Sequence, residues 1–434
     1  MDSQKKNIIS QVFYNIIVAL TVSFVALSLG AAFGLLSGRG AFAGMISAGI
    51  IAIITSLLGG TRVQCSGPTA PMTSVIALVV LAAIQNQWLV ESGINPDHFV
   101  NVVLLLTGLF LIFIAVLRLA KFINLVPNVV ISGFMNGIAL LIWIDQIKKI
   151  FGLGGKEAFR GPIGLNLFVA IATVVFIFIV PKLFKMFRVS FLKFLPSTLV
   201  ALVIMTGFSQ IFNLPIEYIH LSGQLTSLND VSILVKSQWP QNISWPLLKL
   251  AIPFALQLAV LCYLDTLLTS VVVDKMTTEE TKPNKELFAQ GIGNCAVGLV
   301  GGIPGAQATI RSVLMIKEKA NLRLAGVMVG VFVLVEMILF QEWISFIPQS
   351  VFAGILFKVG YDVFDFYPIQ IYLKEIGNRE LNLKQNFFSR HDDEVNFVTN
   401  REMMMIIGTC FVTVLCNLNA AVGIFTIVFY LHNK

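Results

Sequence analysis

A glycine- and proline-containing stretch late in the chain carries residues that could bind a charged ligand. It reads Gly301-Gly-Ile-Pro-Gly-Ala-Gln-Ala-Thr-Ile-Arg-Ser312. Glycine and proline interrupt helices, so the helical pattern restarts only after Pro304, with Gln307, Thr309 and Arg311 in its first turns. A helix that begins there presents unpaired backbone N–H groups and a positive dipole end, and Arg311 adds a full positive charge. This combination suits an anion, although one such stretch also fits a surface loop.

An earlier stretch repeats the same design. It reads Cys65-Ser-Gly-Pro-Thr-Ala-Pro-Met-Thr73, with a Gly-Pro break followed by Thr69 at the start of a new helix. Two such helices from opposite orientations would point their N-termini at each other. An anion between them would meet two positive dipole ends, each worth up to about 2 kcal/mol when partly buried. Thr69, Thr309 and the backbone N–H groups beside them can donate hydrogen bonds to it.

An acidic residue within an apolar run is the third candidate. Asp265 lies in the stretch Leu261-Cys-Tyr-Leu-Asp-Thr-Leu-Leu-Thr269. Asp265 and Thr269 are four residues apart, so they share one face of a helix. A carboxylate, a hydroxyl and the carbonyls of an interrupted helix are oxygen ligands suited to sodium, and a buried acid indicates function. The alternative is a structural ion pair between Asp265 and Arg311.

The spacing near Arg311 leaves its role open. In a helix Gln307 and Arg311 share a face, whereas Thr309 lies about 200° around the axis from Arg311. Arg311 therefore either contacts the anion directly or tunes the local field without touching it. Two further acids in apolar segments are Asp145 and Glu336, for which we expect a role at the membrane interface.

The composition places these stretches inside a membrane protein. Of 434 residues, 56% are hydrophobic and 12% are charged, and the mean hydropathy is +0.85. A soluble domain carries about 25% charged residues, so almost no chain is left for an extramembrane domain. The net charge of +7 is then explained by basic cytoplasmic loops and does not indicate a nucleic-acid partner.

The apolar runs predict an all-α polytopic membrane protein with fourteen transmembrane segments. A spanning helix needs about 20 apolar residues, and several of these runs are shorter. Short extended pieces at 62–67 and 302–305 precede the third and tenth segments, which are therefore half-helices. The predicted segments lie near residues 12–34, 41–58, 69–86, 98–117, 127–147, 165–187, 196–213, 247–271, 286–301, 307–319, 323–342, 347–365, 402–417 and 419–432.

A polar gap divides these segments into two sets of seven. Residues 1–213 form the first set, 214–246 a connecting extracellular loop, and 247–434 the second set, which includes a cytoplasmic loop at 374–402. An odd number of crossings inverts the second half relative to the first. The interrupted helix is then the third member of each half, and paired interrupted helices point to a transporter site at an inverted-repeat interface.

The basic residues predict the orientation of the chain. With both termini in the cytoplasm, most lysines and arginines fall in cytoplasmic segments, as the positive-inside rule requires. The outer loop at 148–160 is a local exception. We therefore expect a multi-pass protein of the inner (plasma) membrane.

Cysteine and histidine give no sign of an enzyme or a metal centre. The five cysteines lie in or beside apolar segments without metal-type spacing, and the four histidines are scattered. No pairing of a nucleophile with a base is visible, and little soluble chain remains to build one. We expect no enzymatic activity and no resident cofactor.

The chain resembles the SulP (sulfate permease) family of inorganic anion transporters over nearly its whole length. It is similar above all to the cyanobacterial sodium-dependent bicarbonate transporters of that family. Five motifs in this order carry the resemblance: Gly67–Thr73, Val130-Ile-Ser-Gly-Phe-Met-Asn-Gly-Ile138, Asp265–Thr269, Asn284-Lys-Glu-Leu-Phe-Ala-Gln-Gly-Ile-Gly-Asn294 and Gly301–Ser312.

The resemblance implies a fold and a site. The fold is a seven-plus-seven inverted repeat with a core domain (helices 1–4 and 8–11) and a gate domain (helices 5–7 and 12–14), working by elevator-type alternating access. Asp265 and Thr269 match the residues that help hold sodium, and Thr69, Ala308 and Thr309 match those that hold the anion. Thr309 is also a candidate sodium ligand. Gln307 and Arg311 complete the expected substrate-binding set.

Three departures from the family pattern bear on substrate and regulation. Gln307 stands where the family often has glycine, so it could narrow or re-line the substrate pocket. Ser28 replaces a usual proline of the first helix. Most members continue into a cytoplasmic STAS domain, whereas this chain stops at Lys434. Either this member has no STAS domain, which we expect, or the domain was removed. Oligomeric state, including a homodimer, stays open.

We therefore expect a secondary active transporter that couples sodium to bicarbonate uptake. The alternatives are transport of sulfate or another oxyanion, coupling to protons through Asp265, and an uncoupled anion channel. A nucleobase permease would share the fold, but Arg311 and the motif around Thr69 favour an anion. Sodium is in this view a coupling ion and not a cofactor.

Overall fold

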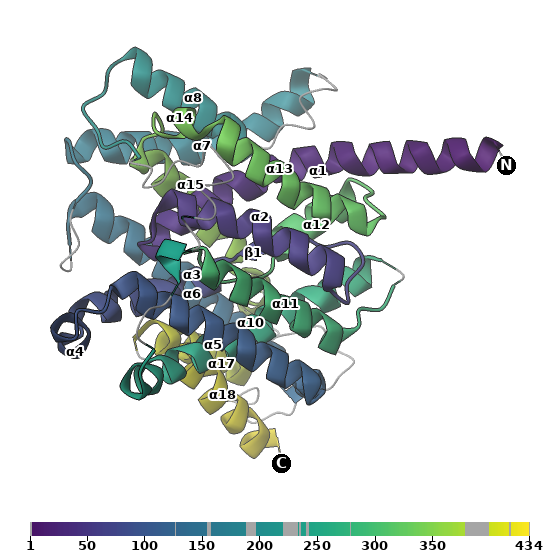
Figure 1. The fold of residues 1–434 in the computed structure, drawn as a ribbon, viewed down its shortest axis with the longest axis vertical. Helices are drawn as coiled ribbons and strands as arrows, with labels where there is room; N and C mark the ends of the chain where they lie inside the picture. The colour runs from purple at the N-terminus through teal and green to yellow at the C-terminus, as the bar shows by residue number, and fades with distance from the viewer. Residues whose placement is uncertain are drawn as a thin grey trace. The chain divides into compact units, whose positions relative to one another are not determined.

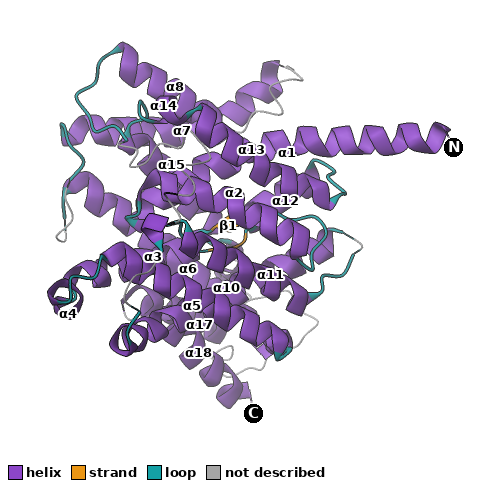
Figure 2. Ribbon diagram, in the orientation of Figure 1, coloured by secondary structure: helices purple, strands orange, loops and turns teal. Residues whose placement is uncertain are grey.

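The computed structural model shows a chain that is helical almost throughout. It describes residues 2–125, 127–153, 158–187, 197–219, 233, 236–239, 243–277, 279–377, 399–415 and 418–433. Helices dominate these residues, and two short strands are their one regular extended element (Figure 2). Most of the predicted loops at 214–246 and 374–402 lies outside the described residues.

The elements are given with their bounds, and Figure 1 labels most of them. They are α1 (Asp2–Ser37), α2 (Gly40–Leu58), β1 (Ser66–Pro68), α3 (Ala70–Gln85), α4 (Gln87–Glu91), α5 (Pro96–Val116), η1 (Leu119–Leu125), α6 (Asn128–Phe151), α7 (Ile163–Phe187), α8 (Ser197–Ile211), α10 (Trp245–Met276), α11 (Pro283–Leu299), β2 (Gly305–Gln307), α12 (Thr309–Lys317), α13 (Arg323–Leu339), α14 (Gln341–Ile344), α15 (Gln349–Val363), α16 (Tyr367–Gly377), α17 (Asn400–Leu415) and α18 (Leu418–Asn433).

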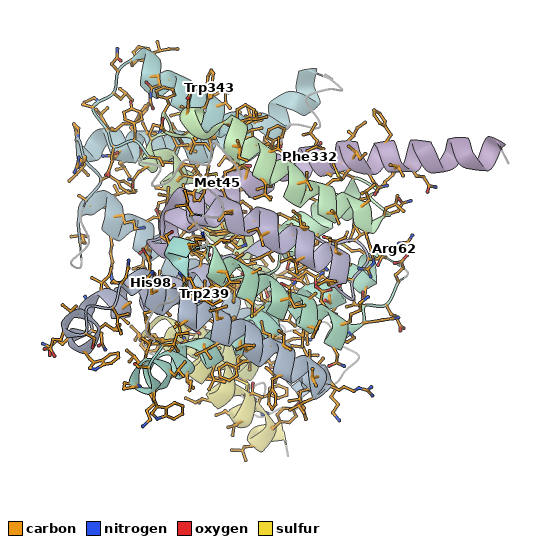
Figure 3. The ribbon with its side chains drawn as sticks, viewed as in Figure 1. Met45, Arg62, His98, Trp239, Phe332 and Trp343 are labelled. Carbon is orange, nitrogen blue, oxygen red and sulfur yellow. The ribbon has the colours of Figure 1, made fainter. Side chains whose placement is uncertain are left out.

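Helix length and composition agree with a membrane protein. Among the described residues, six helices are long and apolar enough to cross a membrane, namely α1, α2, α5, α6, α7 and α10. Large hydrophobic side chains are also exposed, such as Trp239 at 53% and Trp343 at 70% (Figure 3), which suits a lipid solvent. The all-α polytopic architecture is therefore confirmed. A helix lies at each of the fourteen predicted segments, while their crossing as seven plus seven stays a prediction.

The chain forms two compact units. The first comprises residues 1–121 and 148–355, and the second comprises 122–147 and 356–434. The first unit contains both strands and every predicted site residue. It also contains α7 and α8, which the family pattern places in the gate, so the units do not coincide with the predicted core and gate.

Small residues bring the helices of the first unit close together. Helix α1 packs against α2 and α13, and α11 packs against α5 and α2. A Cβ atom added to Gly44 of α2 would lie 1.9 Å from the Gly30 carbonyl oxygen of α1, so only glycine allows this approach. Small residues at helix contacts are the usual solution in membranes, where close backbone packing replaces the hydrophobic effect.

The two strands pair with each other and precede the two half-helices. Strand β1 is antiparallel to β2, with Ser66 opposite Gln307 and Pro68 opposite Gly305. Figure 1 shows β1 beside α2 and amid α3, α10 and α11. The prediction of an extended piece before each half-helix is thus confirmed. Its position differs, because the strands begin a few residues later than the predicted ranges 62–67 and 302–305. Helix α12 starts at Thr309, so the prediction that Gln307 lies in its first turn is wrong.

Candidate functional site

Both half-helices begin with backbone N–H groups that no side chain caps. Thr69 precedes α3 in an extended conformation and makes no side-chain cap. Ala308 precedes α12 in the same way and has no side chain that could cap it. Both residues are buried, at 7% and 8% exposure. N–H groups at a helix start that lack a partner bind a ligand or water, and two helix N-termini together favour an anion. The first residues of α12, Thr309 and Ile310, are exposed.

Helix α10 connects to the starts of both half-helices through side chains on one face. Thr69 donates its hydroxyl hydrogen to Asp265 Oδ2 at 2.7 Å. One turn later, the hydroxyl oxygens of Thr269 and Thr309 lie 2.6 Å apart in a hydrogen bond. Through Asp265 and Thr269, one face of α10 therefore contacts the N-termini of both α3 and α12. These four residues form the centre of the candidate site. Thr309 is exposed, whereas Thr269 is buried.

Gln307 lies in β2 and is fully buried. Its Oε1 accepts a hydrogen bond from Ser270 at 2.7 Å, and its backbone N–H points to the Thr266 hydroxyl at 3.4 Å. The predicted helical face shared with Arg311 does not form, because pairing with Ser66 holds Gln307 in a strand. Its Nε2 is buried without a hydrogen-bond partner among the described residues.

Arg311 is buried and reaches the other strand. Its Nη2 donates to the Pro68 carbonyl at 2.9 Å, and its Nη1 has no hydrogen-bond partner within the described residues. The ion pair with Asp265 that the sequence left open is therefore not the contact that forms. Gly67 has a φ of 150°, which residues with a side chain rarely adopt, and a Cβ atom there would also lie 3.0 Å from the guanidinium, so this position favours glycine. Arg311 fixes the residue before Thr69 and places a full positive charge beside the α3 N-terminus.

Three polar residues of α11 hold the two strands and the segment that leads into β1. Glu286 Oε2 accepts hydrogen bonds from the backbone N–H groups of Gly60 and Thr61 at 2.8 and 2.9 Å. Gln290 donates to Glu286 at 3.1 Å and to Ser66 of β1 at 2.7 Å.

The third residue of this row is Asn294. It exchanges two hydrogen bonds with the Gly305 backbone of β2, at 2.9 and 3.0 Å. Sequence reasoning assigned no role to Glu286, Gln290 or Asn294. Their spacing of four residues within an apolar helix was the available signal, because it puts all three on one face.

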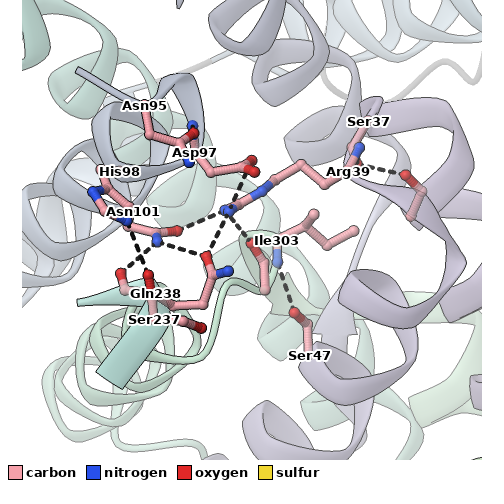
Figure 4. Close-up of polar contacts among 12 residues, drawn as sticks. Ser37, Arg39, Ser47, Asn95, Asp97, His98, Asn101, Ser237, Gln238 and Ile303 are labelled. Carbon is pink, nitrogen blue, oxygen red and sulfur yellow. Dashed lines mark hydrogen bonds and ion pairs between the residues drawn. The ribbon is translucent and has the colours of Figure 1, made fainter. Parts of the chain in front are cut away.

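A buried arginine holds the loop that leads into β2 (Figure 4). Arg39, in the turn between α1 and α2, donates from Nη1 to Asn101 Oδ1 and to the Gly302 carbonyl, both at 2.8 Å. Its Nη2 lies 3.3 Å from the exposed carboxylate of Asp97. Burial lowers the pKa of Arg39, and Asp97 opposes that shift. No sequence pattern indicates this role, because the partners of Arg39 are distant in the chain.

The structure shows the surroundings of the two other acids, Glu336 and Asp145. Glu336, in the last turn of α13, is 5% exposed and hydrogen-bonded to Ser23 inside the first unit. Its predicted role at the membrane interface stays a prediction. Asp145 is partly buried and accepts a hydrogen bond from Gln146 at 3.0 Å. Within the described residues, no group of three or more His, Cys, Asp or Glu side chains could hold a metal ion.

Comparisons with known proteins agree with these observations. The model of the "Sulfate permease family" matches residues 13–381. The bicarbonate transporter BicA of Picosynechococcus sp. is 32% identical over 93% of this chain and 67% of its own length. BicA of Synechocystis sp. is 32% identical over 80% of this chain and 60% of its own length. The chain thus spans about two thirds or less of these relatives.

A solved structure extends the likeness to the fold. The transmembrane domain of a cyanobacterium bicarbonate transporter BicA superposes with a TM-score of 0.76 at 30% identity, covering 95% of this chain and 97% of that domain. Family model, relatives and fold agree on a polytopic membrane transporter of anions and not an enzyme. The chain belongs to the sulfate permease family.

Proposed function

We propose that the protein is a secondary active transporter that couples sodium to the uptake of bicarbonate. The observation that carries this proposal is the hydrogen bond between Thr69 and Asp265, which joins an anion-binding helix start to a carboxylate. Bicarbonate is favoured because the relatives at 32% identity are named as bicarbonate transporters.

The anion site is proposed between the starts of α3 and α12. The uncapped N–H groups after Thr69 and Ala308 supply donors and positive dipole ends. Arg311 adds positive charge through a guanidinium whose Nη1 is buried and unpartnered among the described residues. The Nε2 of Gln307, which likewise lacks a partner there, is a further donor close to the chain that enters α12. A small, planar oxyanion can accept from several such donors at once.

The sodium site is proposed around Asp265, Thr269 and Thr309. This set offers a carboxylate and two hydroxyl oxygens, which are the hard oxygen donors that suit an alkali cation next to an interrupted helix. The 2.6 Å separation of the two threonine oxygens supports one shared ion, because it brings oxygen ligands of α10 and α12 together. The bound cation would neutralise Asp265 and leave the Thr69 hydroxyl free to turn toward the anion.

Transport by elevator-type alternating access is part of the proposal. Asp265 accepts from Thr69 and Thr269 bonds to Thr309, which links α10 to both half-helices. Gln290 and Asn294 donate to β1 and β2, which links α11 to the strands, so these elements are suited to move as one body. In this scheme the body carries both ions across an inner (plasma) membrane, with both termini cytoplasmic.

Uptake by reconstituted protein tests the function directly. Proteoliposomes receive labelled bicarbonate or labelled sulfate, with and without an inward sodium gradient. The proposal expects bicarbonate uptake that rises with sodium in the native protein and loses this dependence in Asp265→Asn. Asp274→Asn is the matched control, because Asp274 lies at the far end of α10 and binds the Thr281 backbone N–H. Sodium-independent bicarbonate uptake that survives Asp265→Asn would refute the coupling.

Sulfate transport coupled to protons is the second candidate, and the family's name favours sulfate. Accumulation of labelled sulfate under an imposed pH gradient in sodium-free buffer would support this second candidate. Currents far above carrier turnover rates in planar bilayers would instead indicate an uncoupled anion channel.

A further inference from the structure

Glu336 is a buried carboxyl group that the proposed transport site does not use. It lies in the last turn of α13 and is 5% exposed. Its Oε1 is 2.5 Å from Ser23 Oγ of α1, and its Oε2 has no hydrogen-bond partner among the described residues. A buried acid within an apolar membrane protein is costly unless it is neutral or paired.

Counting hydrogens at Ser23 indicates which form Glu336 takes. The Ser23 hydroxyl has one hydrogen but faces two acceptors, the Leu20 carbonyl at 2.8 Å and Glu336 Oε1 at 2.5 Å. One of these contacts therefore needs a hydrogen from the other partner, and a main-chain carbonyl has none to give. If Glu336 carries a proton on Oε1, Glu336 donates to Ser23 and Ser23 donates to Leu20. Both short contacts are then satisfied.

The surrounding charges point the same way. Helix α13 packs against α1, α2 and α14. From Gln11 to Ser37, α1 has no Asp, Glu, Lys, Arg or His, and α2 has none at all. A carboxylate at the last turn would also face the negative end of the α13 dipole. Among the described side chains of these elements and of neighbouring α12, the other titratable groups have different surroundings. Tyr14, Lys317 and Glu342 are exposed. Arg323 donates to the Ser56 and Gly59 carbonyls, and Arg311 donates to the Pro68 carbonyl.

We propose that Glu336 and Ser23 form a proton-binding site between α1 and α13, separate from the transport site around Asp265. The bound proton lets the carboxyl group bridge the two helices as a neutral donor. Its loss at alkaline pH leaves an unpaired negative charge in an apolar contact and loosens α1 from α13. Helix α1 also contacts β1, α3 and α12, so loosening it reaches both half-helices. Stability and uptake are then lost together as pH rises.

Unfolding measurements test the proton site without relying on transport. Glu336→Gln keeps the shape and donates an N–H to Ser23, so it mimics the protonated acid at every pH. The full chain in detergent is unfolded by heat across neutral and alkaline pH. The native protein should lose thermal stability as pH rises, whereas Glu336→Gln should match it at neutral pH and stay flat. A Glu336→Gln variant that is less stable at neutral pH, with a native protein that is insensitive to pH, would overturn the proposal.

Two further measurements distinguish proton binding by Glu336 from a purely structural role of this residue. Infrared difference spectra should show the carbonyl band of a protonated carboxyl group in the native protein and not in Glu336→Gln; equal spectra would refute the site. In proteoliposomes, Glu336→Gln should retain uptake at neutral pH and exceed the native protein at alkaline pH. Glu342→Gln, at an exposed position on α14, is the matched control and should follow the native pH profile.

Discussion

Thr69 donates its hydroxyl hydrogen to Asp265 at 2.7 Å instead of capping the helix that it begins. A threonine before a helix commonly accepts from a backbone N–H of its own first turn. Here the hydroxyl is used across the fold, which leaves the α3 N–H groups open. The same bond gives the two proposed ion sites a shared group, so binding at one changes the hydrogen bonding available at the other.

Thr69→Val should change the dependence of uptake on both ions. Valine keeps the shape but removes the donor, and a hydrogen bond to a charged group is worth about 1.5–3 kcal/mol, or about ten- to a hundredfold in affinity. We expect a higher KM for bicarbonate in proteoliposome uptake, because the anion loses a donor, and a changed KM for sodium, because Asp265 loses its hydrogen-bond partner. Thr69→Ser, which keeps the hydroxyl, should stay near native. An unchanged sodium KM in Thr69→Val would show that the two sites are not linked through this bond.

Substitutions of Arg311 distinguish the effect of its positive charge from the effect of its hydrogen bond to the Pro68 carbonyl. Arg311→Lys keeps a positive charge but cannot hold the Pro68 carbonyl in the same fixed geometry. Arg311→Met removes the charge and keeps much of the volume. If the charge attracts the anion, uptake in Arg311→Lys should exceed that in Arg311→Met by at least about tenfold. Equal losses in both variants would assign Arg311 a purely structural role at the start of α3.

Local signals were enough to find the centre of the site. Gly-Pro breaks before Thr69 and Thr309 and an acid within an apolar helix at Asp265 are visible in a few residues each. The structure then brings Thr69 to Asp265 and Thr269 to Thr309. The all-helical architecture followed from composition alone, because a bilayer admits few other folds.

Contacts between distant parts of the chain were not visible in this way. Gln307 was placed in a helix because its neighbours allow one, but its partner Ser66 lies in a different motif and makes it a strand. Arg39 reads as an ordinary loop charge until its contact with the Gly302 carbonyl is known. Glu286 likewise gains its meaning only from the backbone of Gly60 and Thr61.

Glu286→Ala should destabilise the fold more than the same substitution of an acidic residue at the surface. The change leaves the N–H groups of Gly60 and Thr61 buried and unpaired, at about 1–3 kcal/mol each. We expect a clear fall in the unfolding midpoint in detergent, with a smaller fall for Glu286→Gln, whose Oε1 still accepts. Glu280→Ala, at an exposed position, should change stability by less than about 0.5 kcal/mol. Equal midpoints for the alanine variants would contradict a supporting role for Glu286.

Gly305→Ala should disable the protein because the two strands pair without room for a side chain at this position. A Cβ atom at Gly305 would lie 2.4 Å from the carbonyl carbon and oxygen of Gly67, and backbone atoms cannot give way as a flexible side chain can. Overpacking of this kind costs about 1–3 kcal/mol and would also push apart the starts of α3 and α12. Uptake should therefore fall further than the unfolding midpoint alone explains.

A matched substitution in α8 separates that steric effect from the general effect of adding a methyl group. A Cβ atom added to Gly207 would have no neighbouring atom within 4 Å among the described residues, so Gly207→Ala meets open space. Alanine is favoured over glycine inside a helix by about 0.5–1 kcal/mol, so this variant should be as stable as the native protein or slightly more so, with native uptake. If Gly305→Ala instead transports like Gly207→Ala, the close pairing of β1 with β2 does not set the geometry of the half-helix starts.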